Sequence, residues 1–520
     1  MKNKTEITQV LSKIISKDLT IPEVNHFDFD DFKGFLDSPR KISDDQIWYG
    51  KNLNTFIENF DNVVLIGTGG STLGAQCLVE IFATDKVPTF YYADTTNEYD
   101  IIELNKKLDL SKTGFIIASK SGTTIEALSL FEYFYNKLIM NTSQKCPGNQ
   151  FIAITESASN LDIIAKEREF YSVINTDTDL VGRYSVFSPF GTCLAYIAGV
   201  SLDNIAEGAI SCLRSADSKN NQILELTQFI FNAFESGKDK LVIVASKKLH
   251  VFAMWIDQLI AESLGKNGKG IIPVLKGDLF NIESLTEDSI VIFLKDNETD
   301  SIEENVTMGL HPHLDLIIRD EIELSFEMMK WQLSVACLGV LMEINPFNQP
   351  QVEISKRFTN EFIQDSQSND IFGNEYQITS SDCIFEFFDS INQNDYVCLL
   401  NYLNQSSEVL HILNDISNAI SNKLKIYCIV NNAPSYLHST GQLHKGGPNK
   451  GVFIQFCFTE TQSNILIPRN DYTFGKLFNA QADGDLTALI NLERRACRVN
   501  VPEGDLLHYL EDFVNQLNLN

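Results

Sequence analysis

Basic residues are scarce in this 520-residue chain. Its 41 lysines and arginines stand against 69 aspartates and glutamates, which gives a formal charge of −28. Affinity for the phosphate backbone of nucleic acids is built from a basic surface, so this balance argues against nucleic-acid binding. It also argues against binding to an anionic membrane surface. A small anionic ligand is not excluded, because local hydrogen-bond donors hold such a ligand more than the net charge does.

Long apolar runs and paired cysteines are missing as well. No window of the sequence approaches the ~18 uninterrupted apolar residues of a membrane span. The first residues, MKNKTEITQVLSKII, lack the apolar stretch and the small-residue cleavage site of a signal peptide. The ten cysteines are scattered singly, without a CxxC pair, and most lie in apolar runs as buried hydrophobes do. We therefore expect a cytoplasmic protein without disulfides or a metal site.

The remaining composition is that of a globular protein, with 44% apolar and 21% charged residues. After a polar stretch with a helix expected near residues 6–16, apolar runs alternate with helical patterns. Continuous apolar runs between helices are typical of parallel, doubly wound sheets. The runs cover residues 62–70, 114–122, 149–157, 168–176, 239–247, 288–296, 395–403, 424–432 and 451–459.

A helical break near residues 201–237 divides these runs into two series. We therefore expect an α/β fold with two doubly wound parallel-sheet domains, at residues 49–205 and 206–520. The second domain would carry a helical insertion and a C-terminal segment. Residues 1–48 are expected to form a polar, helical N-terminal extension, and the polar segment 360–380 a mobile loop.

The first motif, GTGGSTLG at 67–74, directly follows the run NVVLI. A glycine-rich turn between a strand and a helix exposes backbone N–H groups, which suits a phosphate. The motif is not GxGxxG, because the third glycine would fall at Thr72, and it is not a P-loop, because no GK[ST] follows. A tight turn without a ligand remains the alternative.

The second motif, SKSGTT at 119–124, follows the run GFIIA and precedes a helical pattern. It gathers four hydroxyls and a lysine at one helix start: Ser119, Lys120, Ser121, Thr123 and Thr124. One hydroxyl suffices to cap a helix, whereas several donors suit the oxygens of a phosphate monoester. The two motifs follow strands of one sheet, so we expect them to meet at its carboxyl edge, where open α/β folds bind ligands.

These two turns resemble those of the sugar-isomerase (SIS) domain, and more closely those of the phosphoglucose isomerases, which carry two such α-β-α domains. Three further stretches resemble family motifs: VGRYSVFSPFG (181–191), QLIAESLGKNGKG (258–270) and NPFNQPQVEISK (345–356). The five motifs occur in family order. The resemblance implies reversible isomerisation of glucose 6-phosphate and fructose 6-phosphate, in glycolysis and gluconeogenesis, by a homodimer without a cofactor.

Moving a proton between adjacent carbons through an enediolate needs a carboxylate, a cation for the oxyanion and an acid/base pair for ring opening. The resemblance assigns proton transfer to Glu262, enediolate stabilisation to Arg183 and assistance in ring opening to Lys356. Gln258 lies four residues before Glu262, so both project from one helix face. The residues implied to bind the substrate are Gly70, Ser71, Ser119, Lys120, Ser121, Thr123, Thr124, Gly182, Gln258 and Gln349.

The chain departs from the family in two places. The usual Gly-Gly-Arg is here Val181-Gly182-Arg183. No histidine follows Glu262 closely. The segment YLHSTGQLHKGGPNKGVFIQF (436–456) instead resembles the family's histidine-bearing stretch, and also the isomerase part of fused transaldolase–phosphoglucose isomerase proteins. His438 is therefore the predicted ring-opening residue, with His444 as the alternative. In the family precedent, a dimer, each active site borrows a residue from the partner subunit. Which subunit supplies the histidine is therefore open.

Two other functions fit parts of the pattern. One is another sugar-phosphate isomerase of the same fold, including one that also accepts mannose 6-phosphate. The other is a sugar-phosphate sensor without catalysis, which would keep the two hydroxyl-rich turns but could dispense with Glu262, His438 and Lys356. The joint presence of these three residues favours an enzyme.

Overall fold

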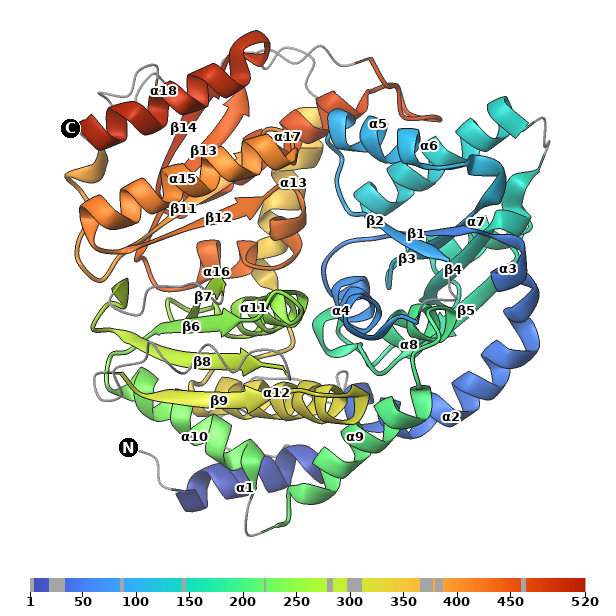
Figure 1. Ribbon diagram of the computed structural model, residues 1–520, viewed down its shortest axis with the longest axis horizontal. Helices are drawn as coiled ribbons and strands as arrows, with labels where there is room; N and C mark the ends of the chain where they lie inside the picture. Colours follow the sequence, from blue (N-terminus) through green and yellow to red (C-terminus); the bar gives the residue numbers. More distant parts are fainter. Residues whose placement is uncertain are drawn as a thin grey trace.

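The computed structural model describes residues 4–17, 33–84, 88–142, 146–218, 221–277, 284–296, 311–364, 377–378, 387–459 and 464–519. Within these ranges the chain forms three sheets, and the strand pairs in each sheet are parallel (Figure 1). The predicted α/β class is thereby confirmed. Of the expected loop at 360–380, residues 365–376 and 379–380 lie outside the described ranges.

The first sheet has the order β2-β1-β3-β4-β5 and forms the centre of the first lobe. Along β1, Val63 and Leu65 belong to an apolar cluster on one face, whereas Val64 and Ile66 belong to a cluster on the other. Burial on both faces explains why these strands are continuous apolar runs. The elements of this lobe are α2 (Gly34–Asn52), α3 (Asn54–Asn59), β1 (Asn62–Ile66), α4 (Leu73–Phe82), β2 (Thr89–Ala93), α5 (Glu98–Lys107), β3 (Thr113–Ala118), α6 (Ile125–Thr142), β4 (Phe151–Glu156), α7 (Asn160–Glu167), β5 (Ser172–Thr176) and α8 (Pro189–Ile197).

The second lobe contains the other two sheets, with the orders β7-β6-β8-β9 and β10-β14-β13-β11-β12. Its first part comprises α9 (Leu202–Ser215), α10 (Gln222–Glu235), β6 (Lys240–Ala245), α11 (His250–Leu264), β7 (Ile272–Gly277), β8 (Ser289–Lys295), β9 (His313–Ile317) and α12 (Glu321–Leu341). Its second part comprises α13 (Pro350–Gln364), β10 (Gln377–Ile378), β11 (Tyr396–Tyr402), α15 (Ser407–Leu424), β12 (Tyr427–Asn432), α16 (Gly441–Gly446), β13 (Gly451–Phe458), α17 (Phe474–Asn491), β14 (Arg495–Val501) and α18 (Leu506–Leu519).

The N-terminal helices pack into both lobes. Helix α1 (Lys4–Ile15) lies against α10 and α12 of the second lobe, where Ile7 and Leu11 are buried (Figure 1). Helix α2 packs on α8 and α9, and its Phe35 ring contacts the rings of Tyr184 and Phe347. Helix α2 therefore contacts elements of both lobes, whereas α1 contacts the second lobe.

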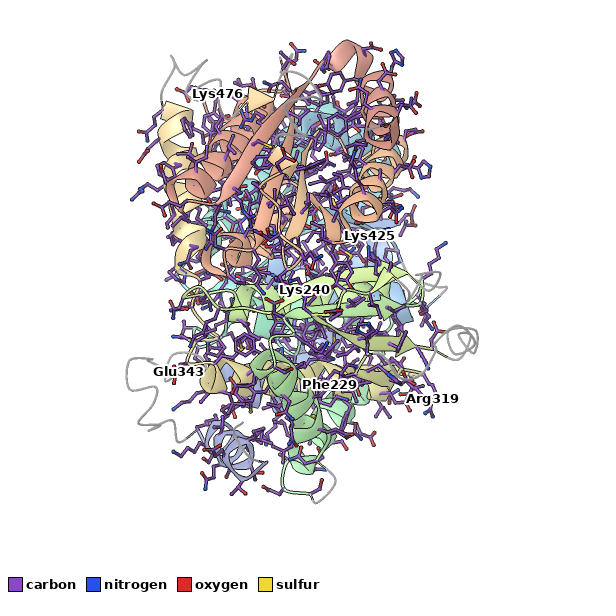
Figure 2. All side chains as sticks on the ribbon, turned by 90° about the vertical axis from the view of Figure 1, so that its left-hand side faces the viewer. Phe229, Lys240, Arg319, Glu343, Lys425 and Lys476 are labelled. Atoms are coloured by element: carbon purple, nitrogen blue, oxygen red, sulfur yellow. The ribbon has the colours of Figure 1, made fainter. Side chains whose placement is uncertain are left out.

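Two sheets of the second lobe meet at their edge strands β7 and β12, and one apolar cluster includes residues of both. At their boundary the buried ammonium of Lys240 pairs with Asp239 and Asp288 and donates to the backbone oxygen of Asn394 (Figure 2). The predicted second domain, 206–520, thus contains two sheets. The pattern of buried runs does not reveal this, because strands of both sheets have the same apolar character.

Replacing Lys240 by methionine should lower the free energy of unfolding by about 3 kcal/mol, because the buried carboxylate of Asp239 and the largely covered carboxylate of Asp288 would lose their shared cation. Urea denaturation followed by circular dichroism measures this change. Lys450→Met is the matched control, since Lys450 also pairs with Asp239 but is partly exposed. Equal unfolding midpoints for the two variants would contradict the importance of the Lys240 cluster.

Candidate active site

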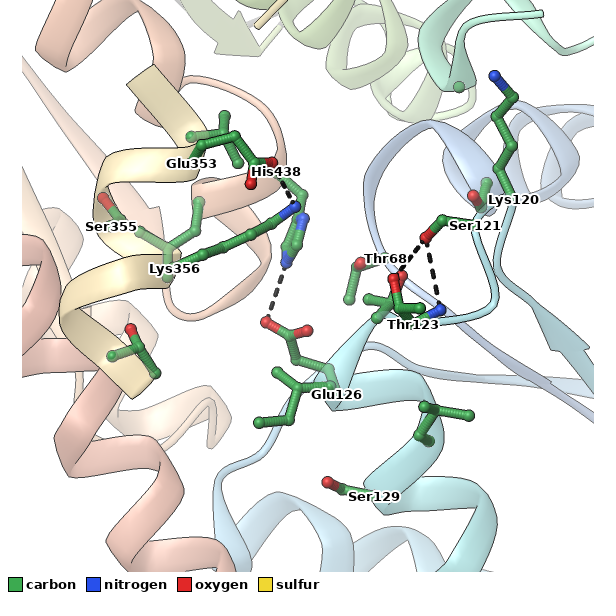
Figure 3. Close-up of a pocket in the computed structure, with 18 of the residues that line it drawn as sticks. Thr68, Lys120, Ser121, Thr123, Glu126, Ser129, Glu353, Ser355, Lys356 and His438 are labelled. Carbon is green, nitrogen blue, oxygen red and sulfur yellow. Dashed lines mark hydrogen bonds and ion pairs between the residues drawn. The ribbon is translucent and has the colours of Figure 1, made fainter. Parts of the chain in front are cut away.

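A cleft of about 1170 Å³ lies between the two lobes (Figure 3). On one side it is lined by the turns that follow β1 and β3, and on the other by α11, α13 and the short helix η10 (Ser435–His438). The structure brings thirteen of the fourteen predicted site residues to its wall. They are Gly70, Ser71, Lys120, Ser121, Thr123, Thr124, Gly182, Arg183, Gln258, Glu262, Gln349, Lys356 and His438.

The turn after β3 presents hydroxyls in two hydrogen-bonded pairs. Ser121 Oγ lies 2.8 Å from Thr123 Oγ1, and Ser119 Oγ lies 2.9 Å from Thr124 Oγ1. Gly122, between them, has a φ of +67° that favours glycine. The turn ends at the N-terminus of α6, an 18-residue helix whose dipole favours an anion. This arrangement suits the oxygens of a phosphate.

Two predicted substrate-binding residues have side chains that are held by other partners. Ser119 is buried behind the turn and reaches the cleft only through Thr124. The ammonium of Lys120 pairs with Glu156 at 3.1 Å and donates to the backbone oxygen of Thr178 at 3.0 Å, so it points away from Ser121 in Figure 3. The motif forms a turn between a strand and a helix, as predicted, but the direction of each side chain depends on partners outside the motif.

The turn after β1 meets the turn that carries Arg183. These turns contain the short helices η3 (Gly69–Ser71) and η6 (Gly182–Tyr184). A Cβ atom on Gly70 would lie 2.1 Å from the carbonyl carbon of Gly182, a distance that real Cβ atoms do not adopt. A Cβ on Gly182 would find its nearest neighbour at 3.6 Å, which is ordinary contact. Gly70 is therefore the glycine on which this approach depends.

Arg183 is buried at the floor of the cleft, and its guanidinium is held on several sides. Nε donates to Ser263 Oγ at 2.8 Å, and Nη2 donates to the backbone oxygens of Pro346 and Asn348. Nη1 donates to Gln349 Oε1 at 3.1 Å and lies 3.2 Å from Glu262 Oε1. The NPFNQP segment thus fixes the arginine as a preorganised positive group beside Glu262, which is what stabilisation of an oxyanion requires.

Glu262 and Gln258 lie one turn apart on α11, as predicted, and face the cleft. Gln258 Nε2 donates to Glu262 Oε2 at 3.2 Å and to the backbone oxygen of His438 at 2.9 Å. The carboxylate of Glu262 therefore has one oxygen near Arg183 and the other near Gln258. Both contacts hold the carboxylate in place at the wall of the cleft.

His438 has a partner that the sequence analysis missed. Its Nε2 lies 2.9 Å from Oε1 of Glu126, in the first turn of α6 (Figure 3). Burial alone would raise the pKa of Glu126, but the charge and hydrogen bond of His438 and the charge of Lys356 outweigh it, so that this pKa is lowered. One signal was available: a glutamate on the apolar face of TIEALSLFEYF has to be buried, and a buried carboxylate requires a partner.

Lys356 and His444 differ from expectation in their surroundings. Lys356 lies on the α13 wall of the cleft, half exposed, and its ammonium pairs with Glu353 at 2.9 Å. His444 is buried between the rings of Tyr436 and Phe453 and lies outside the cleft. Burial, with the nearby charges of Lys445 and Arg494, holds the pKa of His444 well below its usual range. The geometry favours His438 over His444 for proton transfer.

The described residues contain no group of three or more histidine, cysteine, aspartate or glutamate side chains that could hold a metal ion. Among the same residues, no helix combines the length and the apolar character that crossing a bilayer demands.

Comparison with known proteins gives consistent results. The sequence matches the model of the phosphoglucose isomerase family over residues 20–281. It is 25% identical to a glucose-6-phosphate isomerase of Mesoplasma florum over 379 residues, which cover 63% of this chain and 88% of the relative. It is 26% identical to a glucose-6-phosphate isomerase of Enterococcus faecalis over 388 residues, which cover 63% of this chain and 86% of the relative.

Solved structures share the fold. A hypothetical protein of Thermus thermophilus superposes with a TM-score of 0.58 at 20% identity, covering 69% of this chain and 95% of the other. A glucose-6-phosphate isomerase of Chlamydia trachomatis superposes with a TM-score of 0.55 at 17% identity. This superposition covers 68% of this chain and 77% of the other.

Proposed function

Because this chain belongs to the phosphoglucose isomerase family, we propose that it interconverts glucose 6-phosphate and fructose 6-phosphate. The observation that carries the proposal is the meeting of three features in one cleft. These are the hydroxyl-rich turn at the start of α6, the Glu262–Arg183 pair and the Glu126–His438 pair. A phosphate site, a proton carrier beside a fixed cation and a paired histidine are together what an aldose–ketose isomerase needs.

In this proposal the phosphate is bound by Ser121, Thr123, Thr124 and the backbone N–H groups of both turns, with Ser71 on the opposite side. Ser119 supports Thr124 through its hydrogen bond, and Lys120 contributes its backbone. Helix α6 adds its N-terminal partial charge. Binding of the phosphate at this end leaves the sugar carbons to lie toward Glu262 and His438.

Ring opening comes first. A proton moves from the anomeric hydroxyl to the ring oxygen, the bond between the ring oxygen and the anomeric carbon breaks, and a carbonyl forms. We assign this transfer to His438, which Glu126 orients, with assistance from Lys356. Substrate would draw the Lys356 ammonium from its exposed partner Glu353 at little cost, because exposed ion pairs contribute little.

Proton transfer follows. Glu262 removes the proton next to the carbonyl and returns it to the adjacent carbon, while Arg183 stabilises the negative charge of the cis-enediolate. Gln258, Gln349 and Gly182 surround this position and would contact the sugar. No step requires a cofactor, because the carboxylate and the fixed guanidinium supply the base and the positive charge.

The wider setting is part of the same proposal. The reaction would place the enzyme in glycolysis and gluconeogenesis, in the cytoplasm, as a homodimer that binds neither nucleic acid nor membranes. The scattered cysteines and the excess of acidic residues support this setting. We divide the chain into an extension (1–48), a first SIS domain (49–205) and a second (206–520). Residues 436–456 suggest the subgroup similar to the isomerase part of fused transaldolase proteins.

Proton NMR of fructose 6-phosphate with the purified protein in D2O, without added metal, tests the proposal. We expect glucose 6-phosphate with deuterium at C2, because Glu262 exchanges its proton with solvent between removal and return. A mannose 6-phosphate signal would show that the other epimer is accepted. Binding without any conversion would contradict the proposal and favour a sugar-phosphate sensor.

A further inference from the structure

Helix α17 of the second lobe reaches the Glu126–His438 pair through one buried amide. Gln481 is 2% exposed, and its Nε2 donates to Glu126 Oε1 at 2.7 Å. The same carboxylate oxygen lies 2.9 Å from Nε2 of His438. Gln481 is thus a direct neighbour of the carboxylate that orients the histidine, although it comes from the opposite lobe and a distant part of the sequence.

The orientation of this amide is fixed by its other end. Oε1 of Gln481 accepts a hydrogen bond from Thr96 Oγ1 at 2.6 Å, and Thr96 is fully buried in the loop between β2 and α5. An amide whose oxygen is engaged in this way must present its NH2 group to Glu126. Thr96 thus donates to Gln481 and Gln481 donates to Glu126, so the hydrogen bonds of this chain converge on the carboxylate that lies beside His438.

One turn further along α17, Asp485 holds the backbone segment of the histidine. Its buried carboxylate accepts a hydrogen bond from Tyr436 OH and pairs with Lys445. Tyr436 stands two residues before His438 on η10, and Lys445 lies on α16. One face of α17 thus contacts both parts of the pair, the acid through Gln481 and the histidine segment through Asp485.

We propose that Gln481 is a positioning residue for ring opening. By donating to Glu126, it keeps this carboxyl ionised and directed at Nε2 of His438. The other charged groups that act on the pair are Lys356, whose charge favours ionised Glu126, and Asp94, which lies near enough to His438 to sense its charge. The inference rests on the proposed function, because it concerns the step assigned to His438.

The test compares three variants with the wild type. Gln481→Met removes the donor but keeps the length of the side chain. Thr96→Val keeps Gln481 but releases its oxygen. Gln150→Met is the control, since Gln150 is an equally buried glutamine that donates only to backbone oxygens of the first lobe. For each variant, kcat for fructose 6-phosphate, its pH profile and the inhibition constant of an acyclic five-carbon aldonate 5-phosphate are measured.

Gln481→Met removes a hydrogen bond to the charged carboxylate of Glu126, and such bonds are stronger than neutral ones. This variant should therefore lower kcat roughly 10- to 100-fold. Thr96→Val should lower it roughly 2- to 10-fold, because a neutral hydrogen bond is weaker. The acyclic aldonate needs no ring opening, so its affinity should stay unchanged. Loss of the donor also raises the pKa of Glu126, so the acid limb of the pH profile should move to higher pH. Gln150→Met should match the wild type in all three measurements.

Two outcomes would overturn the inference. One is a kcat of Gln481→Met within twofold of the wild type. The other is a loss of aldonate affinity in Gln481→Met that equals its loss of kcat, because this would indicate general distortion of the cleft. Thr96→Val checks that reading, because it leaves the Gln481 side chain in place: it too should lower kcat without lowering aldonate affinity. If the wild type itself fails to isomerise the sugar phosphate, the proposed function fails, and not this inference alone.

Discussion

Replacing Glu262 by glutamine should abolish isomerisation while leaving sugar-phosphate binding largely intact. A positioned base typically contributes a factor of 10² to 10⁴, so we expect kcat to fall by roughly 10³-fold or more when the group that moves the proton between the two carbons is removed. Glutamine keeps the shape of the side chain and can still accept from Gln258. Arg183 keeps its contacts to Ser263, Pro346, Asn348 and Gln349, so the enediolate site should stay formed.

Two measurements check this expectation: turnover of fructose 6-phosphate, and deuterium incorporation at C2 in D2O. Ligand-induced thermal stabilisation by the same sugar phosphate reports binding independently. Glu361→Gln is a matched control, because Glu361 lies exposed on α13 and pairs with Arg357. Turnover in Glu262→Gln above a tenth of the wild-type value would assign the base to another group.

Removing the imidazole in His438→Asn should lower kcat for the cyclic sugar phosphates by roughly 10²-fold or more, because the ring-opening proton loses its carrier. Glu126→Gln should cause a comparable loss, since it removes the carboxylate that orients the ring. The double variant should be little worse than either single one, because the two residues act as a unit. His411→Asn, on the exposed face of α15, serves as the control.

The pair also predicts the direction of a pH effect. The pKa of Glu126 is lowered in the folded protein, so the carboxylate stays ionised until the pH falls through that lowered value. The stabilisation of the pair is fully present above the ordinary glutamate pKa and is lost only on further acidification. Activity should therefore persist into acid more in the wild type than in a variant with a weakened pair. If the losses of kcat in His438→Asn and Glu126→Gln simply multiplied in the double variant, the two residues would not act as a unit.

The sequence predicted the interior of the sheets better than their edges. All nine apolar runs became strands. Seven of them lie inside their sheets, where burial on both faces leaves a continuous apolar signal, and two, β5 and β12, lie at sheet edges. Strands β2, β7 and β9 were missed. Each lies at a sheet edge, and the residues of β2 and β9 are largely half-exposed or exposed. Strand β14 was missed because it carries Arg495 and Arg498, whose charges are paired with Asp395 and Asp483 in the fold.

The site shows a similar division. The motifs predicted which segments line the cleft, such as the part of α11 that carries Glu262 and the hydroxyl-bearing turn before α6. They did not reveal partners that only the tertiary fold supplies, such as Glu126 for His438, or Glu156, which turns the ammonium of Lys120 away. Nor could they show that the histidine segment of this chain reaches its own first lobe, as the intrachain contact with Glu126 demonstrates.

The distance along the chain between the parts of this site has a consequence for biosynthesis. Glu126 and His438 are separated by 312 positions, and Glu126 and Gln481 by 355. A nascent chain exposes the phosphate turns long before it contains η10, and α17 follows later still. The contact between Glu126 and His438 is therefore among the last that the chain can form. If the proposed roles hold, a polypeptide released early would contain the phosphate-binding turns without the pair that opens a cyclic sugar.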